Sequence, residues 1–157
     1  MAEEFVILAA QVREYLRAGV IKVLLVEDNP GDVAMFSKIL AKSEIKFAVD
    51  AVMEPEEAMR VIRERRHNVV VLDWNLGHDR KTGLEIVQHL HAEKVFFPFM
   101  FLTAHAEEDF LDALNLDGLG FLHKDNLQHE QLEWQLAHAF KEWYSRQSMN
   151  AARTAST

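Results

Sequence analysis

Short apolar runs alternate with amphipathic segments along most of this chain. The runs at 23–26, 69–72 and 99–102 are apolar at every position, which is typical of strands that are buried on both faces of a parallel sheet. The segments between the runs carry apolar residues at helical spacing, as at 33–40. Strands that alternate with helices in this way predict an α/β domain with helices on both faces of the sheet.

The pattern also predicts where the individual elements begin and end. The expected strands are 22–26, 46–50, 69–73, 97–102 and 119–123. The expected helices are 3–18, 32–42, 54–67, 84–92, 106–116 and 127–145. We expect an N-terminal helical extension at 1–20, one domain at 21–146 and a flexible tail at 147–157, because the tail residues are small and polar.

Composition and charge restrict the classes of protein that this chain can represent. Its 157 residues fit one domain with a modest extension, and a net charge of −8 without a cluster of Lys or Arg argues against a nucleic-acid-binding surface. The chain has no cysteine, which excludes disulfides and thiolate chemistry and is compatible with a reducing cytosol. No apolar stretch approaches the roughly 18 residues that cross a bilayer, and the acidic start is unlike a signal peptide. We therefore expect a cytoplasmic protein.

Polar side chains of complementary chemistry stand at the ends of the predicted strands. Glu27 and Asp28 follow the first strand, Asp73 ends the third, Thr103 follows the fourth and Lys124 follows the fifth. Each of them alone can be a solvated loop acid, a strand-end hydroxyl or a surface amine. Together they would meet at the carboxyl edge of the sheet, which is where open α/β sheets bind ligands.

The acids at this edge point to a metal ion and a phosphoryl group. If the first and third strands are neighbours, Asp28 and Asp73 face each other, and clustered carboxylates repel unless a cation or a raised pKa relieves them. Carboxylate and carbonyl oxygens suit Mg²⁺ or Mn²⁺. Such an ion, together with the hydroxyl and the amine, would neutralise the oxygens of a phosphoryl group.

Four short motifs in this order resemble the receiver domain of two-component response regulators. They are Val-Glu-Asp-Asn-Pro at 26–30, Leu-Asp-Trp-Asn-Leu at 72–76, Leu-Thr-Ala at 102–104 and Phe-Leu-His-Lys at 121–124. The resemblance covers about residues 21–145. It implies a flavodoxin-like sheet of five parallel strands in the order 2-1-3-4-5.

The resemblance also implies a role for each residue at the edge. Asp73 would accept a phosphoryl group from a phosphohistidine of a sensor kinase or a phosphotransfer protein. Asp28, Asp73 and the backbone carbonyl of Asn75 would bind Mg²⁺, with Mn²⁺ also possible, and Glu27 would hold the ion through water.

Two further residues would bind the phosphoryl oxygens, and one would transmit the change. Thr103 and Lys124 are the expected partners of the phosphoryl oxygens. Phe121 matches the family's aromatic switch, a ring that changes rotamer when the threonine moves. The implied function is a single-domain receiver that contacts a downstream protein, although a phosphate carrier in a relay fits equally well.

Two other functions are compatible with parts of the sequence. One is a binding or dimerisation module that works without phosphorylation, because Phe5, Leu8 and Val12 line one side of the N-terminal helix; packing of this helix on its own domain is an equal alternative. The other is an enzyme such as an aspartate-dependent phosphatase, which needs an acid two positions after its nucleophile. Asn75 occupies that position, so we expect no enzyme beyond the chain's own phosphorylation and dephosphorylation.

Overall fold

Five parallel strands form a single sheet in the order β2-β1-β3-β4-β5. The computed structural model describes residues 2–16, 19–74, 83–103, 120–124, 127 and 129–155. The strands are β1 Val20–Val26, β2 Lys46–Val52, β3 Val69–Asp73, β4 Phe99–Thr103 and β5 Phe121–His123. This order confirms the flavodoxin-like arrangement, and the predicted strand boundaries agree to within two residues.

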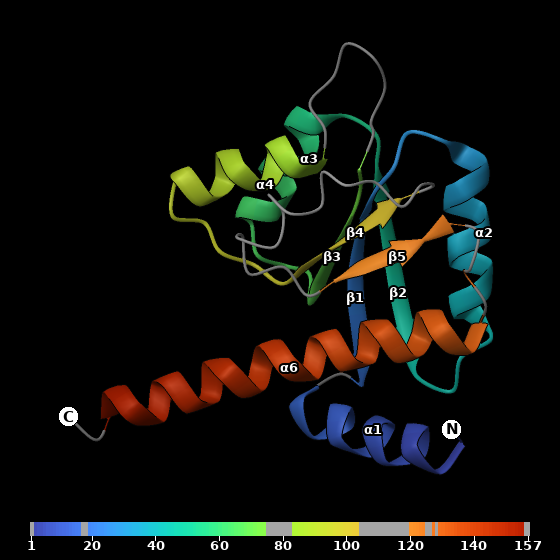
Figure 1. Cartoon of the computed structure of the whole chain (residues 1–157), viewed down its shortest axis with the longest axis vertical. Coiled ribbons are helices and arrows are strands. Elements are labelled where there is room, and N and C mark those ends of the chain that lie inside the picture. Colours follow the sequence, from blue (N-terminus) through green and yellow to red (C-terminus); the bar gives the residue numbers. More distant parts are fainter. Residues whose placement is uncertain are drawn as a thin grey trace.

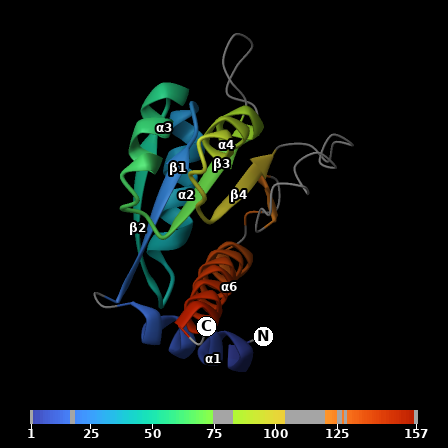
Figure 2. The same ribbon diagram turned by 90° about the vertical axis from the view of Figure 1, so that its left-hand side faces the viewer.

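Helices cover both faces of the sheet, as predicted. The described helices are α1 Ala2–Tyr15, α2 Pro30–Ala41, α3 Pro55–Arg63, α4 Gly83–Ala92 and α6 His129–Ala155. Helices α3 and α4 lie on one face of the sheet, and α2 and α6 lie on the other (Figures 1 and 2). The helix expected at 106–116 lies outside the described residues.

The central strands explain why each face has its own apolar core. Successive side chains of a strand point to opposite faces. In β1, Ile21, Val23 and Leu25 therefore pack with α2 and α6, whereas Leu24 and Val26 pack with α3 and α4. All five are fully buried, which accounts for the uninterrupted apolar run in the sequence.

The N-terminal helix packs against its own domain, which answers a question that the sequence left open. Leu8 and Val12 are buried in the same core as Phe140 of α6. At the end of α1, the Tyr15 hydroxyl lies 3.2 Å from the Ser145 hydroxyl, and its ring meets that of Phe140 edge-on at 6.3 Å. Helix α1 thus lies along the outer side of α6 (Figure 1), and its residues Leu8 and Val12 are buried within the domain.

The last helix is longer than predicted. The sequence pattern predicted its end near residue 145, but the structure continues α6 to Ala155, so this predicted end is wrong, whereas the flexibility of 147–157 stays a prediction. Residues 146–155 contain neither glycine nor proline, and a helix already fixed by packing adds such residues at little cost. The end of α6 therefore extends past the sheet (Figure 1). Among the described residues, no helix is both long enough and apolar enough to cross a membrane.

The packing of α1 can be tested with two neighbouring side chains. Leu8 is 4% exposed, whereas the adjacent Ile7 is 59% exposed. We expect Leu8→Ala to lower the free energy of unfolding by about 2–4 kcal/mol, because it leaves a cavity between α1 and α6. Ile7→Ala should change it by less than about 0.5 kcal/mol. Urea denaturation measures both values, and equal effects would contradict the packing.

Candidate functional site

The register of the sheet brings the polar strand ends together. In the β1–β3 pair Val26 is aligned with Leu72, so Glu27 and Asp73 are level with each other. In the β3–β4 pair Asp73 is aligned with Leu102. Glu27 and Asp73 therefore stand at the same edge of the sheet, although more than forty residues separate them in the sequence.

The same edge receives the hydroxyl and the amine from the next two strands. Thr103 is aligned with His123 in the β4–β5 pair, and Lys124 follows directly. Thr103 is 3% exposed. The structure thus brings Glu27, Asp73, Thr103 and Lys124 to one place, where the sequence expected them.

Three carboxylates form a cluster that can hold a divalent cation. One oxygen each of Glu27, Asp28 and Asp73 lie within 4.8 Å of one another. Glu27 and Asp73 are buried, and the Oε2 atom of Glu27 has no hydrogen-bond partner among the described residues. Hard carboxylate oxygens, one of them buried without an aligned hydrogen bond, fit Mg²⁺ or Mn²⁺. Asn75, the remaining expected ligand, lies outside the described residues.

The burial of Glu27 changes its acidity. Burial first, and then the negative charge of Asp73, raise the pKa of Glu27 from 4.5 to about 7. The contact with Lys124 and, to a smaller extent, the hydrogen bond that the Asn29 backbone N–H donates to Oε1 at 3.1 Å oppose this change only in part. A proton and a cation therefore compete for this carboxyl group at neutral pH.

Lys124 supplies the positive charge of the site. Its Nζ lies 3.0 Å from Glu27 Oε2, 3.0 Å from Asp32 Oδ2 and 3.3 Å from Asp73 Oδ2. Burial alone would lower the pKa of Lys124, but its contacts with Asp32 and Glu27 and the charge of Asp73 outweigh burial and raise it. The ammonium therefore stays protonated and offsets part of the repulsion among the acids.

Asp32 is a member of this site that the sequence analysis missed. It stands in the first turn of α2, where Asn29 caps the helix by accepting hydrogen bonds from the backbone N–H groups of Gly31 and Asp32 at 2.8 and 3.2 Å. An acid at this position is explained by the helix dipole alone. The sequence therefore gave no sign of a second partner, and only the fold brings Lys124 to it.

Phe121 packs beside the site within a group of aromatic rings. Its ring stacks on Phe101 with centroids 5.6 Å apart, and Phe101 in turn meets the ring of Trp74 at 5.1 Å. The ring is partly buried against the core below α3 and α4. This location is compatible with the expected switch, and the rotamer change itself stays a prediction.

A glycine lets α4 approach the end of β3 closely. A Cβ atom at Gly83 would lie 2.5 Å from the backbone oxygen of Asp73, well inside the distance at which two atoms can pack. The helix therefore sits directly against the residue that carries the central carboxylate. The sequence predicted the helix but not this contact.

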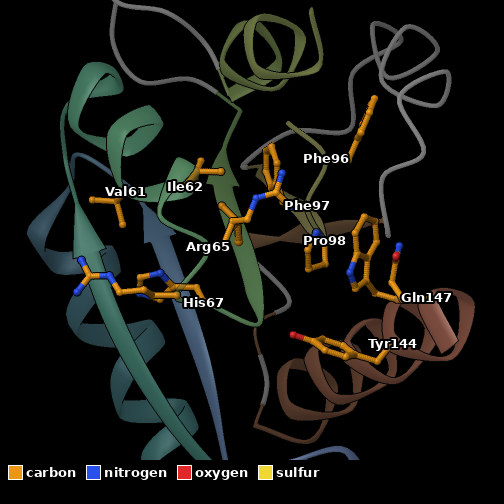
Figure 3. A pocket seen from close by; sticks show the side chains of 12 residues that line it. Val61, Ile62, Arg65, His67, Phe96, Phe97, Pro98, Tyr144 and Gln147 are labelled. Atoms are coloured by element: carbon orange, nitrogen blue, oxygen red, sulfur yellow. The ribbon is translucent and has the colours of Figure 1, made fainter. Parts of the chain in front are cut away.

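A hollow lined by described residues lies elsewhere. It has a volume of about 380 Å³ and is lined by residues that precede β3 and β4, such as His67 and Pro98, and by Tyr144 of α6 (Figure 3). These positions place it at the amino edge of the sheet, away from Asp73. Its lining contains no carboxylate, so the acid cluster, not the hollow, is the place for a divalent cation.

Comparison with known proteins identifies the family. The profile of the response regulator receiver domain matches residues 23–136, which is most of the chain. The chain therefore belongs to the receiver domains of two-component response regulators, whose role lies in signalling and not in metabolic catalysis.

Curated relatives and solved structures agree with this assignment. The chain is 30% identical to the two-component response regulator PhoP of Pseudomonas aeruginosa over 73% of its length and 49% of the relative. It is 39% identical to the regulatory protein VirG of Agrobacterium tumefaciens over 65% of its length and 37% of the relative. The chain thus spans half or less of the length of these relatives.

Two solved structures show the same fold. A receiver domain of a putative LuxO repressor from Vibrio parahaemolyticus has a TM-score of 0.70 at 18% identity, covering 82% of this chain and 96% of that one. The Mn²⁺-bound form of response regulator Rcp1 has a TM-score of 0.58 at 24% identity, covering 73% of this chain and 88% of that one.

The raised pKa of Glu27 predicts how stability depends on pH. Because the folded protein binds this proton more tightly than the unfolded chain, the free energy of unfolding without metal should fall as pH rises from 4.5 to about 7. The loss should be about 1–3 kcal/mol, and Mg²⁺ should restore more stability at pH 8 than at pH 5.5. Urea denaturation with EDTA or Mg²⁺ measures this, and Glu27→Gln, which cannot titrate, should remove the slope. An equal slope in that variant would contradict the assignment.

The contact at Gly83 predicts a loss of stability at the centre of the site. Gly83→Ala should lower the free energy of unfolding by about 2–4 kcal/mol, because the new methyl group meets backbone atoms that cannot turn away. Gly31→Ala is a matched change in the first turn of α2, where the nearest atom is the Asn29 side chain at 3.1 Å, and it should cost less. Urea denaturation compares the two, and the opposite order would contradict the close approach.

Proposed function

We propose that this receiver accepts a phosphoryl group on Asp73 and that the modified domain signals through protein contact. The observation that carries the proposal is the position of one buried acid between other carboxylates and a positively charged amine. The Asp73 carboxylate lies in a cluster of three acids within 4.8 Å and also 3.3 Å from the amine of Lys124. One carboxylate is thereby poised between a place for a divalent cation and a fixed ammonium.

Asp73 is suited to act as the nucleophile. In the transfer, one of its carboxylate oxygens forms a bond to phosphorus, while the bond between phosphorus and the histidine nitrogen of the donor breaks and the electron pair stays on that nitrogen. Water later attacks the phosphorus, releases inorganic phosphate and restores the carboxylate. The donor is a sensor histidine kinase or a phosphotransfer protein.

The other residues of the site orient and neutralise the transferred group. Lys124 and Thr103 offer an N–H and an O–H to its oxygens. Asp28, Asp73 and the carbonyl of Asn75 would hold a Mg²⁺ or Mn²⁺ ion, Glu27 would hold it through water, and the ion would supply positive charge to the same oxygens. The Mn²⁺ of the related Rcp1 structure supports this choice of ion.

The response would start at the strand ends beside the phosphoryl group. Closure of Thr103 on the new group shifts an existing equilibrium between two conformations. Phe121, which stacks on Phe101 two strand positions before Thr103, is the ring that changes rotamer with it. The altered surface contacts the downstream protein or, in a relay, the next carrier.

The alternative of a module that works without phosphorylation is not favoured. Its basis was the apolar side of the N-terminal helix, but Leu8 and Val12 are buried against the domain itself. No second candidate function is therefore proposed for this chain.

Phosphorylation can be tested with a small-molecule donor. Incubation with acetyl phosphate and Mg²⁺ should add one phosphoryl group to the intact protein, and EDTA should prevent the addition. Asp73→Asn should abolish it, because an amide oxygen is a far weaker nucleophile. The matched control is Asp50→Asn, since the Asp50 side chain is 77% exposed and pairs with His67. Intact-mass spectrometry measures each reaction, and a phosphoryl group retained by Asp73→Asn would refute the proposal.

A further inference from the structure

The amine of Lys124 is fully engaged in the structure, and one of its partners has no place in the proposed chemistry. An ammonium group has three N–H donors, and Nζ faces three carboxylates at 3.0, 3.0 and 3.3 Å. Glu27 and Asp73 belong to the acid cluster. The third partner is Asp32, whose side chain is 29% exposed.

Asp32 is held in a position from which it can reach Lys124. Its backbone N–H donates to the cap residue Asn29 at 3.2 Å, which fixes the first turn of α2. Its side chain accepts a hydrogen bond from Lys124 with good geometry, as does that of Asp73. Contact with Glu27 is equally short, but Glu27 Oε2 has no hydrogen bond of acceptable geometry. Asp32 is thus the closest hydrogen-bonded partner of the amine.

A phosphoryl group on Asp73 would need the same amine. Both Asp32 Oδ2 and Asp73 Oδ2 touch one nitrogen, so they lie no more than about two hydrogen-bond lengths apart. The phosphorylated side chain carries a charge of about −1.5 to −2 on its phosphoryl oxygens, in place of the single negative charge of the carboxylate. Asp32 is then both a competitor for the amine and a nearby like charge.

We propose that Asp32 is a positioning residue that holds Lys124 in the unphosphorylated protein and opposes the phosphorylated state by competing with the phosphoryl group for this amine. On phosphorylation one N–H of Lys124 turns from Asp32 to a phosphoryl oxygen, and the carboxylate at the start of α2 is released to water. The first turn of α2 thereby senses the modification in addition to Thr103 and Phe121. This inference rests on the proposed function of Asp73.

Binding of beryllium trifluoride at saturating Mg²⁺ tests the competition as an equilibrium. This tetrahedral anion attaches to a carboxylate oxygen and mimics the phosphoryl group without being hydrolysed. Asp32→Asn should bind it about fivefold more tightly than the unaltered protein, since a partly exposed like charge is worth the lower end of typical coupling energies. Asp32→Glu, which keeps the charge, should bind it nearly as the unaltered protein does. The change in tryptophan fluorescence reports binding, because Trp74 directly follows Asp73.

Two controls separate competition from a general effect of charge or of helix capping. Glu57 stands in the first turn of α3, three residues after its cap residue Glu54, as Asp32 stands three residues after Asn29. Its side chain is 50% exposed, so Glu57→Gln makes the same change of charge at an equivalent position and should leave the affinity unchanged. Titration of Mg²⁺ alone should show equal or weaker binding in Asp32→Asn, because the variant has lost a negative charge near the ion site. The two affinities thus move differently, which a purely structural role of Asp32 would not produce.

The affinities of these variants for the mimic either support or contradict the role of Asp32. Unchanged or weaker binding of the mimic by Asp32→Asn overturns the role of Asp32, and so does an equal gain in Glu57→Gln. If the unaltered protein neither binds the mimic nor takes up a phosphoryl group, the proposed function of Asp73 fails instead. Binding by the unaltered protein that Asp73→Asn abolishes separates these two failures.

Discussion

Repulsion among buried carboxylates is the constraint around which this molecule is organised. The parallel register of β1 and β3 makes Glu27 level with Asp73 at one edge of the sheet, and the three acids there lie within 4.8 Å of one another. Such an arrangement persists only if positive charge or a proton compensates it. The ammonium of Lys124 provides part of the compensation, while burial first and then the charge of Asp73 still raise the pKa of Glu27. A divalent cation would offset the remaining negative charge of the three carboxylates.

The apolar layers on each side of the sheet hold this unfavourable cluster in place. The central strands are buried on both faces, so their ends cannot move apart without exposing the cores below α2 and α6 or below α3 and α4. The close approach of Gly83 to the backbone of Asp73 adds a second restraint. Stability gained from apolar burial thus maintains a site whose own electrostatics oppose folding, as is common where charge is needed for function.

The two ends of the sheet have different roles in this molecule. The carboxyl edge carries the acids and the amine. The amino edge is extended by α1 and the long α6, which pack on each other through Leu8, Val12 and Phe140 (Figure 2). Apolar contacts there are made within one chain and involve no charge that the site uses. The extension therefore adds to the core without reaching the chemistry at the other edge.

The sequence by itself predicted the buried strands and most of the site, and the strand order followed from its resemblance to the receiver family. Uninterrupted apolar runs are typical of strands covered on both faces, and the carboxyl ends of parallel strands share one edge. The grouping of Glu27, Asp73, Thr103 and Lys124 follows from these two facts, and the structure confirms it.

Only the tertiary structure decided how α1, α6 and Asp32 are used. The periodicity of α1 shows that one side is apolar but not whether its partner is the same chain or another, because burial is decided by packing. The end of α6 was missed because small polar residues are weak signals, and a helix that is already anchored extends through them. Asp32 could not be found because its spacing to Asn29 is explained locally by the helix dipole. Its contact with Lys124 joins residues that are 92 positions apart, and no local pattern encodes such a pair.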